Sequence, residues 1–369
     1  MAHSPAVAKD SIDQVTLVEV RAAQRHLREI INGEHLSDDS FSTIPTIDLG
    51  GSFSARLEDR QAVARELGAA SRTTGFFYIR NHGVSDELCA RTLALAERFF
   101  RELSRDKKEA LHMSKSRLFR GWKGSETEQA SRHSMPELEM KEAFNWGYQA
   151  ELDVTGGDGQ YAELDGTRGM SNVWPREEDL PGFFDGIREY YGQILQLSRH
   201  LFRLFALSLK LPEAHFDAMT THPGGIARLL YYPALGNNES QGHGRHVGIR
   251  PHSDFECFTV LLQSDCAGLQ AQSPDGKWVD ATPMKGALVV NIGDFMMRMT
   301  NGLYKSTAHR VLSSPKERWS IPFFFSVNYD ATVDVIASCV SEENPAKYPP
   351  VTAGQYVLER LRLALQDHE

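Results

Sequence analysis

A histidine and an aspartate separated by one residue, His252 and Asp254, are the first candidates for chemistry. On a β-strand, residues i and i+2 point to the same face, so this imidazole and this carboxylate would converge on one point. A third ligand has to come from elsewhere, and His309, in the β-like run 304–311, is the best candidate. Two histidines and one carboxylate on one face of an Fe(II) ion leave its other positions open. We therefore predict a metal site made of these three residues.

The segment after His309 strengthens this prediction, since a His-x-Asp pair alone is weak in a chain with 14 histidines. Residues 313–317 indicate a turn, and a strand-like run follows it. If a hairpin is centred near residues 314–315, Ser320 lies opposite His309, and Arg318 shares that face. A buried guanidinium requires an anionic partner, and a carboxylate that binds two of its nitrogens is the natural one. The alternative is an ion pair with a structural aspartate or glutamate.

The composition is that of an ordinary globular protein of 369 residues, with 41% hydrophobic and 24% charged residues. The formal net charge of −9 does not favour a nucleic acid or an anionic membrane as partner. No apolar run reaches the roughly 18 residues of a transmembrane helix, and residues 1–14 do not resemble a secretory signal. We expect a cytoplasmic protein that acts on a small molecule and not on a nucleic acid or a membrane. The oligomeric state is not predicted.

The four cysteines have no Cys-x-x-Cys spacing, which argues against a zinc site or a dithiol motif. We expect free thiols in a reducing compartment. The cysteines are Cys89, Cys257, Cys266 and Cys339.

The elements that must hold the candidate ligands change in kind near residue 226. Beyond it, short β-rich runs alternate with turn signals such as the Pro-Asp-Gly sequence at 274–276. Seven or so short strands at this spacing indicate an antiparallel sandwich or barrel. The expected strands are 227–232, 252–263, 267–272, 277–281, 286–292, 303–311 and 318–327.

Before residue 226 the apolar residues recur mainly at helical spacing. The helix expected at 86–102 has Ser85 as a plausible N-cap, and the one at 182–210 is apolar enough to lie buried under a sheet. The other expected elements are helices at 15–32, 57–72 and 353–367 and strands at 44–49, 75–79 and 140–148.

We therefore expect one compact domain that is mainly β with surrounding helices. Its expected parts are an N-terminal tail and outer helix (1–43), a helical and mixed region that packs on the core (44–225), the core with the metal site (226–330) and a C-terminal segment with a helix (331–369).

Taken in order, His252-x-Asp254, His309 and Arg318-x-Ser320 resemble the 2-oxoglutarate/Fe(II) oxygenases of the isopenicillin N synthase-like family. The resemblance covers roughly residues 44–365. The sequence near 280–283 and 305–311 is similar to that of fungal members, including the thymine 7-hydroxylase branch. It implies a distorted jelly-roll, the double-stranded β-helix, with iron near its open end.

The resemblance also implies the cofactors, which are Fe(II) and the co-substrates 2-oxoglutarate and O₂. The 2-oxo acid end of 2-oxoglutarate would chelate the iron, and its far carboxylate would pair with Arg318 and Ser320. Tyr232 fits the place of a tyrosine that family members often add to this site. An asparagine common two residues earlier is Leu230 here, so that contact is absent. Catalysis would be centred on iron, with no separate acid or base assigned.

The substrate is expected to lie against residues that face the metal, and their aromatic bias favours a fairly apolar or planar small molecule. The resemblance implies oxidation of a C–H bond with release of succinate and CO₂, in fungal secondary metabolism. Hydroxylation is the default outcome, while desaturation, ring expansion and ring closure stay open. Core packing is the alternative for each aromatic candidate, and a surface position is the alternative for Arg228. The candidates are Arg228, Phe119, Trp122, Met140, Phe144, Trp146, Phe325 and Asn328.

Two other functions also stay open. An Fe(II) oxidase of the isopenicillin N synthase type would use a similar Arg-x-Ser pair without 2-oxoglutarate. A barrel that has lost catalysis would only bind a small molecule.

Overall fold

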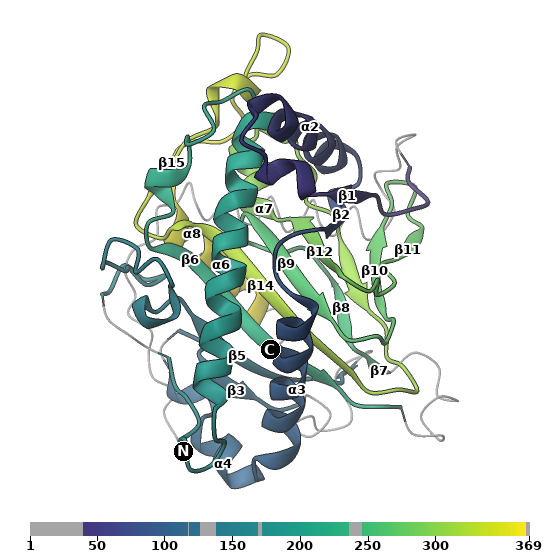
Figure 1. The fold of residues 1–369 in the computed structure, drawn as a ribbon, viewed down its shortest axis with the longest axis vertical. Helices are drawn as coiled ribbons and strands as arrows, with labels where there is room; N and C mark the ends of the chain where they lie inside the picture. The colour runs from purple at the N-terminus through teal and green to yellow at the C-terminus, as the bar shows by residue number, and fades with distance from the viewer. Residues whose placement is uncertain (1–39, 117, 126–137, 169–171, 236–245, 367–369) are drawn as a thin grey trace.

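The computed structural model describes residues 40–116, 118–125, 138–168, 172–235 and 246–366 (Figure 1). The helix predicted at 15–32 lies outside these ranges. Within them, no helix has both the length and the apolar character needed to cross a membrane.

In the described part of the chain, the larger sheet has eight strands in the order β1-β2-β12-β9-β14-β6-β5-β3. Its neighbouring strands are antiparallel except for β1 and β2, which are parallel. The strands are β1 (Thr46–Asp48), β2 (Phe76–Arg80), β3 (Gly121–Lys123), β5 (Glu142–Gly147), β6 (Pro223–Tyr232), β9 (Phe258–Gln263), β12 (Ala287–Ile292) and β14 (Arg318–Asn328).

Half of this sheet comes from the region 44–225, which was expected to pack on the core. Strands β1, β2, β3 and β5 all precede residue 226, and β2 and β5 each pair directly with a strand from the second half. The change of pattern near 226 marks where long helices give way to consecutive strands. It does not mark the edge of the sheet, because hydrogen-bonded neighbours need not be neighbours in sequence.

A smaller antiparallel sheet, in the order β11-β10-β13-β8, faces the larger one. Apolar side chains of both sheets face each other between them, among them Leu261 and Val289 from the larger sheet and Leu269 and Val311 from the smaller. The predicted mainly β, jelly-roll core is confirmed. The strands are β8 (Ile249–His252), β10 (Leu269–Gln272), β11 (Trp278–Asp280) and β13 (His309–Val311), and two short pairs join β4 (Leu138–Glu139) to β7 (His246–Val247) and β15 (Thr332–Val333) to β16 (Val351–Thr352).

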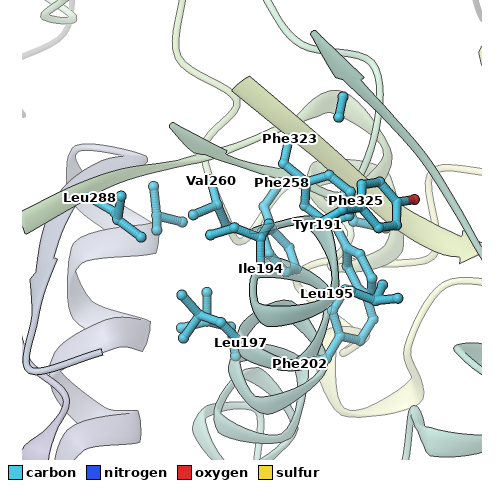
Figure 2. Packing of buried hydrophobic residues seen from close by; sticks show 14 of the residues in the cluster. Tyr191, Ile194, Leu195, Leu197, Phe202, Phe258, Val260, Leu288, Phe323 and Phe325 are labelled. Atoms are coloured by element: carbon cyan, nitrogen blue, oxygen red, sulfur yellow. The ribbon is translucent and has the colours of Figure 1, made fainter. Parts of the chain in front are cut away.

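The long helix α6 (Phe183–Ser208) crosses the outer face of the larger sheet, with α3 (Asp86–Glu102) beside it (Figure 1). Figure 2 shows how its side chains meet those of the sheet. The ring centroids of Tyr191 and Phe323 are 5.1 Å apart, and those of Phe202 and Phe325 are 5.4 Å apart. This second apolar layer explains why the apolar residues of α6 occupy so much of its surface.

The helix boundaries follow local signals where those signals are strong. The Oγ of Ser85 accepts a hydrogen bond from the backbone N–H of Leu88 at 3.1 Å, so α3 begins at the predicted cap. The six-residue helix α7 (Asp294–Met299) was not predicted, because a stretch this short shows no periodicity. The remaining helices are α2 (Leu57–Thr73), α4 (Arg105–Ala110) and α8 (Ala353–Gln366), and the 3₁₀ turns are Gly50–Phe53, Met113–Lys115, Ala150–Leu152, Asp217–Met219 and Ala337–Cys339.

Candidate metal centre

The three predicted metal ligands lie together at one end of the smaller sheet. His252 ends β8 and His309 begins β13, and the two residues are direct partners across these antiparallel strands. Asp254 follows β8 in a loop, so the expectation that it shares the strand of His252 is wrong. Its Oδ1 is nevertheless 3.6 Å from the Nε2 of His309 and 3.9 Å from the Nε2 of His252.

The protonation of both imidazoles suits a metal. The Nδ1 of His252 is 2.8 Å from the carbonyl oxygen of Arg250, and the Nδ1 of His309 is 3.1 Å from that of Thr307. A carbonyl can only accept, so each Nδ1 carries the proton and each Nε2 keeps a lone pair. Burial and the neighbouring His309 lower the pKa of His252 to about 4, so this ring stays neutral at pH 7.

The carboxylate of Asp254 is held by two polar side chains of the larger sheet. Its Oδ2 accepts hydrogen bonds from the Oγ1 of Thr259 at 2.5 Å and the Nδ2 of Asn291 at 2.7 Å. Burial alone would raise the pKa of Asp254, but the imidazoles and these hydrogen bonds lower it below its ordinary value. An ionised carboxylate with one oxygen already bonded offers Oδ1 to a cation. The donor set therefore fits Fe(II).

Behind the ligands, Asp294 of α7 links three segments. It accepts hydrogen bonds from the hydroxyl of Ser253 at 3.0 Å, the hydroxyl of Ser306 at 2.6 Å and the guanidinium of Arg360 at 2.5 Å. Its own backbone N–H donates to the carbonyl of Asp254 at 2.8 Å. The loop that carries Asp254 is thereby fixed to helix α8. This network could not be predicted from the sequence, because its members are far apart in the chain.

Arg318 lies inside the molecule with neutral partners. It is 1% exposed, and it donates to the Oγ of Ser320 at 3.1 Å and the Oε1 of Gln263 at 2.8 Å. The ring of Tyr232 lies 4.9 Å from its guanidinium carbon. Among the described residues no carboxylate pairs with it, so the structural ion pair considered from the sequence is not what the fold provides.

The predicted hairpin between His309 and Arg318 does not exist. Strand β14 pairs with β6 and β9, whereas β13 pairs with β10 and β8. Arg318 and Ser320 therefore approach from the sheet opposite the two histidines. They still face the interior, because Tyr232 and Leu230, their partners on β6, belong to the apolar layer between the sheets.

Four of the predicted substrate-contacting aromatics point the other way, and we correct that prediction. Alternate residues of a strand face opposite sides, and it is Ala143 that faces the space between the sheets. The four aromatics lie fully buried in the cluster on the α6 side, where Phe144 also contacts Phe99 and Phe183. They are Trp122, Phe144, Trp146 and Phe325.

The other four candidates divide in two. Asn328 has a structural role, because it accepts from the backbone N–H of His222 and donates to the hydroxyl of Thr221, each at 3.0 Å. Met140 lies in the short link between β4 and β5, with its N–H bonded to the carbonyl of Val247.

Arg228 and the backbone of Phe119 both lie next to Asn145 of β5. The guanidinium of Arg228 lies over the ring of Phe324, 5.1 Å from its centroid. The carbonyl of Phe119 accepts from Asn145 at 3.2 Å, and Asn145 is the partner of Arg228 across β5 and β6. Gln263, Phe324 and Asn145 also lie at this site and were not predicted, although each continues the alternation of an expected strand.

Comparison with known proteins agrees with this geometry. The 2OG-Fe(II) oxygenase superfamily model matches residues 223–327, and the model described as the N-terminal region of non-haem dioxygenase in morphine synthesis matches residues 44–177. The 2-oxoglutarate-Fe(II) type oxidoreductase hxnY of Emericella nidulans is 34% identical over 318 residues, which cover 85% of this chain and 88% of that protein. The 2-oxoglutarate-Fe(II) type oxidoreductase ppzC of Metarhizium rileyi is 33% identical over 332 residues, which cover 87% of this chain and 87% of that protein.

A solved structure extends the agreement to three dimensions. The thymine 7-hydroxylase of Neurospora crassa, in complex with alpha-KG and thymine, superposes with a TM-score of 0.75 at 26% identity, covering 87% of this chain and 97% of that one. This chain therefore belongs to the 2OG-Fe(II) oxygenase superfamily, and the predicted resemblance is confirmed. It is an oxidoreductase that uses Fe(II), 2-oxoglutarate and O₂.

Proposed function

We propose that this enzyme oxidises a C–H bond of a small, fairly apolar or aromatic molecule in the cytoplasm, within fungal secondary metabolism. Succinate and CO₂ would be released from 2-oxoglutarate. The observation that carries the proposal is a buried arginine without a carboxylate partner among the described residues, inside the same sheet sandwich as three convergent metal ligands. Structural ion pairs would not leave Arg318 in that state.

In this proposal each group has one task. His252, Asp254 and His309 hold Fe(II), which when bound supplies the activation of O₂ for C–H oxidation. Arg318 binds the far carboxylate of 2-oxoglutarate through two of its nitrogens, assisted by the hydroxyl of Ser320. The ring of Tyr232 covers the guanidinium and keeps water from it.

The rest of the interior orients the substrate and limits water. Apolar side chains of both sheets line the space between them, which favours a substrate with an apolar body. Arg228, Phe119 and Phe324 are the described residues that we place nearest to it. An Fe(II) oxidase without 2-oxoglutarate is not favoured, because both fungal relatives described above are 2-oxoglutarate-Fe(II) types.

Anaerobic titration with Fe(II) followed by 2-oxoglutarate tests the proposal. We expect a weak visible charge-transfer band that requires both additions, and succinate formation once O₂ is admitted. The His252→Ala variant should keep the circular dichroism of the folded protein and lose both signals. An unchanged band in this variant would refute the ligand assignment, and O₂ uptake without succinate would refute the use of 2-oxoglutarate.

A further inference from the structure

Arg228 is a cation on the interior face of the larger sheet. It stands two and four residues before Leu230 and Tyr232 on β6, so all three point between the two sheets. Its Nε is buried without a hydrogen-bond partner. Its guanidinium forms no ion pair with any residue that the structure describes, and its one close neighbour of note is the ring of Phe324 at 5.1 Å.

The charged groups around Arg228 are already engaged. Asp254 exerts the strongest attraction on it, but that carboxylate belongs to the metal centre. Glu139 lies 2.5 Å from the Nζ of Lys141 and accepts from the backbone N–H of Arg250 at 3.0 Å. Arg120 is a second buried cation, with Glu163 as its own partner at 3.4 Å.

When Fe(II) and 2-oxoglutarate are bound, the other charges of the site balance and the positive charge of Arg228 has no counterpart. An Fe(II) ion and Arg318 carry three positive charges, and Asp254 with the two carboxylates of 2-oxoglutarate carries three negative ones. The guanidinium of Arg228, which is partly buried with its Nε fully enclosed, then remains uncompensated, and a desolvated charge without a partner is costly. Burial lowers the pKa of Arg228 for the same reason. A single negative charge supplied by a ligand would remove this cost.

We propose, building on the function proposed above, that the substrate is a monoanion whose carboxylate is bound by Arg228. The ring of Phe324, which lies against the guanidinium, contacts the apolar body next to that carboxylate. The Oδ1 of Asn145, opposite Arg228 on β5, is buried and also lacks a partner, so a hydrogen-bond donor beside the carboxylate fits there. The substrate class is thus a small apolar or aromatic monocarboxylic acid.

The test uses matched acids and amides on the full-length protein, held anaerobically with saturating Fe(II) and 2-oxoglutarate so that Arg318 is occupied. The probes are benzoate, phenylacetate and cyclohexanecarboxylate, each paired with its carboxamide. Binding is followed by the perturbation of the visible band and by thermal unfolding. We expect at least one acid to bind roughly tenfold more tightly than its amide, the value of one charge-assisted hydrogen-bonded pair.

The Arg228→Gln variant should reduce this preference to less than about twofold while the affinity for 2-oxoglutarate stays unchanged. Arg168→Gln is the matched control, because the side chain of Arg168 is 64% exposed. Since Arg228 is unpaired without substrate, its replacement should not lower the melting temperature of the unliganded protein.

Three results would overturn the inference. They are equal or absent binding of acids and amides by the wild-type protein, a preference that survives in Arg228→Gln, and a loss of 2-oxoglutarate affinity in that variant. Failure of the underlying function would look different, since the band would not form in the wild-type protein at all.

Discussion

At the scale of single residues, the hydrogen bonds around the three proposed ligands decide which atom each of them can offer to a metal. Backbone carbonyls fix the proton of each histidine on Nδ1, and Thr259 and Asn291 occupy one oxygen of Asp254. The remaining lone pairs converge within 4.8 Å of one another. Ligand types alone would not ensure this, because a free carboxylate can turn either oxygen toward a cation.

Asn291→Ala should weaken Fe(II) binding by about 10-fold to 100-fold, since it removes a bond that orients Asp254. Thr259→Val should act in the same direction, whereas Thr259→Ser keeps the hydroxyl and should bind iron nearly as the wild type does. Anaerobic Fe(II) titration of the folded variants measures the affinities. Wild-type affinity in Asn291→Ala would show that the bond is dispensable.

Gln263→Glu should weaken 2-oxoglutarate binding about tenfold, because it gives Arg318 a carboxylate of nearly the same shape 2.8 Å away. The KM for 2-oxoglutarate, followed by succinate release, is the measurement. Gln270→Glu is the control, because Gln270 accepts a bond from Arg310 on the smaller sheet, outside the proposed site. A KM that rises equally in both variants would count against the role of Arg318.

At the scale of elements, two helices that contribute none of the proposed ligands hold the candidate metal centre in place. Helix α7 supplies Asp294, and helix α8 supplies Arg360, whose side chain is 2% exposed. The C-terminal helix therefore reaches the loop between His252 and Asp254 through a buried ion pair. Breaking one partner of such a pair leaves the other charge buried and unpaired.

Arg360→Met should lower the free energy of unfolding by about 3–5 kcal/mol and also reduce iron affinity. Arg362→Met, on the same helix but with a side chain that is 25% exposed, should cost less than about 1 kcal/mol. Urea unfolding of both variants gives the comparison. Similar losses of unfolding free energy in the two variants would mean that the ion pair of Arg360 with Asp294 contributes no more than a more exposed one.

At the scale of the whole molecule, the larger sheet has one face that packs against helices and another that carries the residues of the proposed site. Its outer face packs against α6 (Figure 2), and its inner face carries Arg318, Arg228 and the polar partners of Asp254. Neighbouring residues of one strand therefore serve different purposes. Phe325 lies fully buried on the outer face, while Phe324 lies under Arg228 on the inner one.

Phe325→Ala should lower the free energy of unfolding by about 3–5 kcal/mol, as expected for a fully packed phenylalanine. Phe324→Ala should cost clearly less stability and instead weaken binding of the monocarboxylate probes. Denaturant unfolding and the probe titration separate the two effects. The reverse assignment of effects would contradict the arrangement of the two layers.

Short stretches of the chain were enough to predict the chemistry and most of the elements. Ligand types, the Arg-x-Ser pair, strand alternation and the Ser85 cap are local properties, so they can be recognised without the fold. The mainly β class and the proposal of His252, Asp254 and His309 as metal ligands followed from them. The four misplaced aromatics show the limit, because a pattern of period two says that faces alternate but not which face looks at the site.

The way in which distant segments combine followed from the tertiary fold and from no local pattern. The fold placed Arg318 in the sheet opposite His309 and not in a hairpin with it, and it brought Asp294 and Arg360 behind the ligands. It also left Arg228 without a counter-charge among the described residues. The physical reason is the same in each case: strand pairing and the compensation of buried charge depend on which segments meet in space.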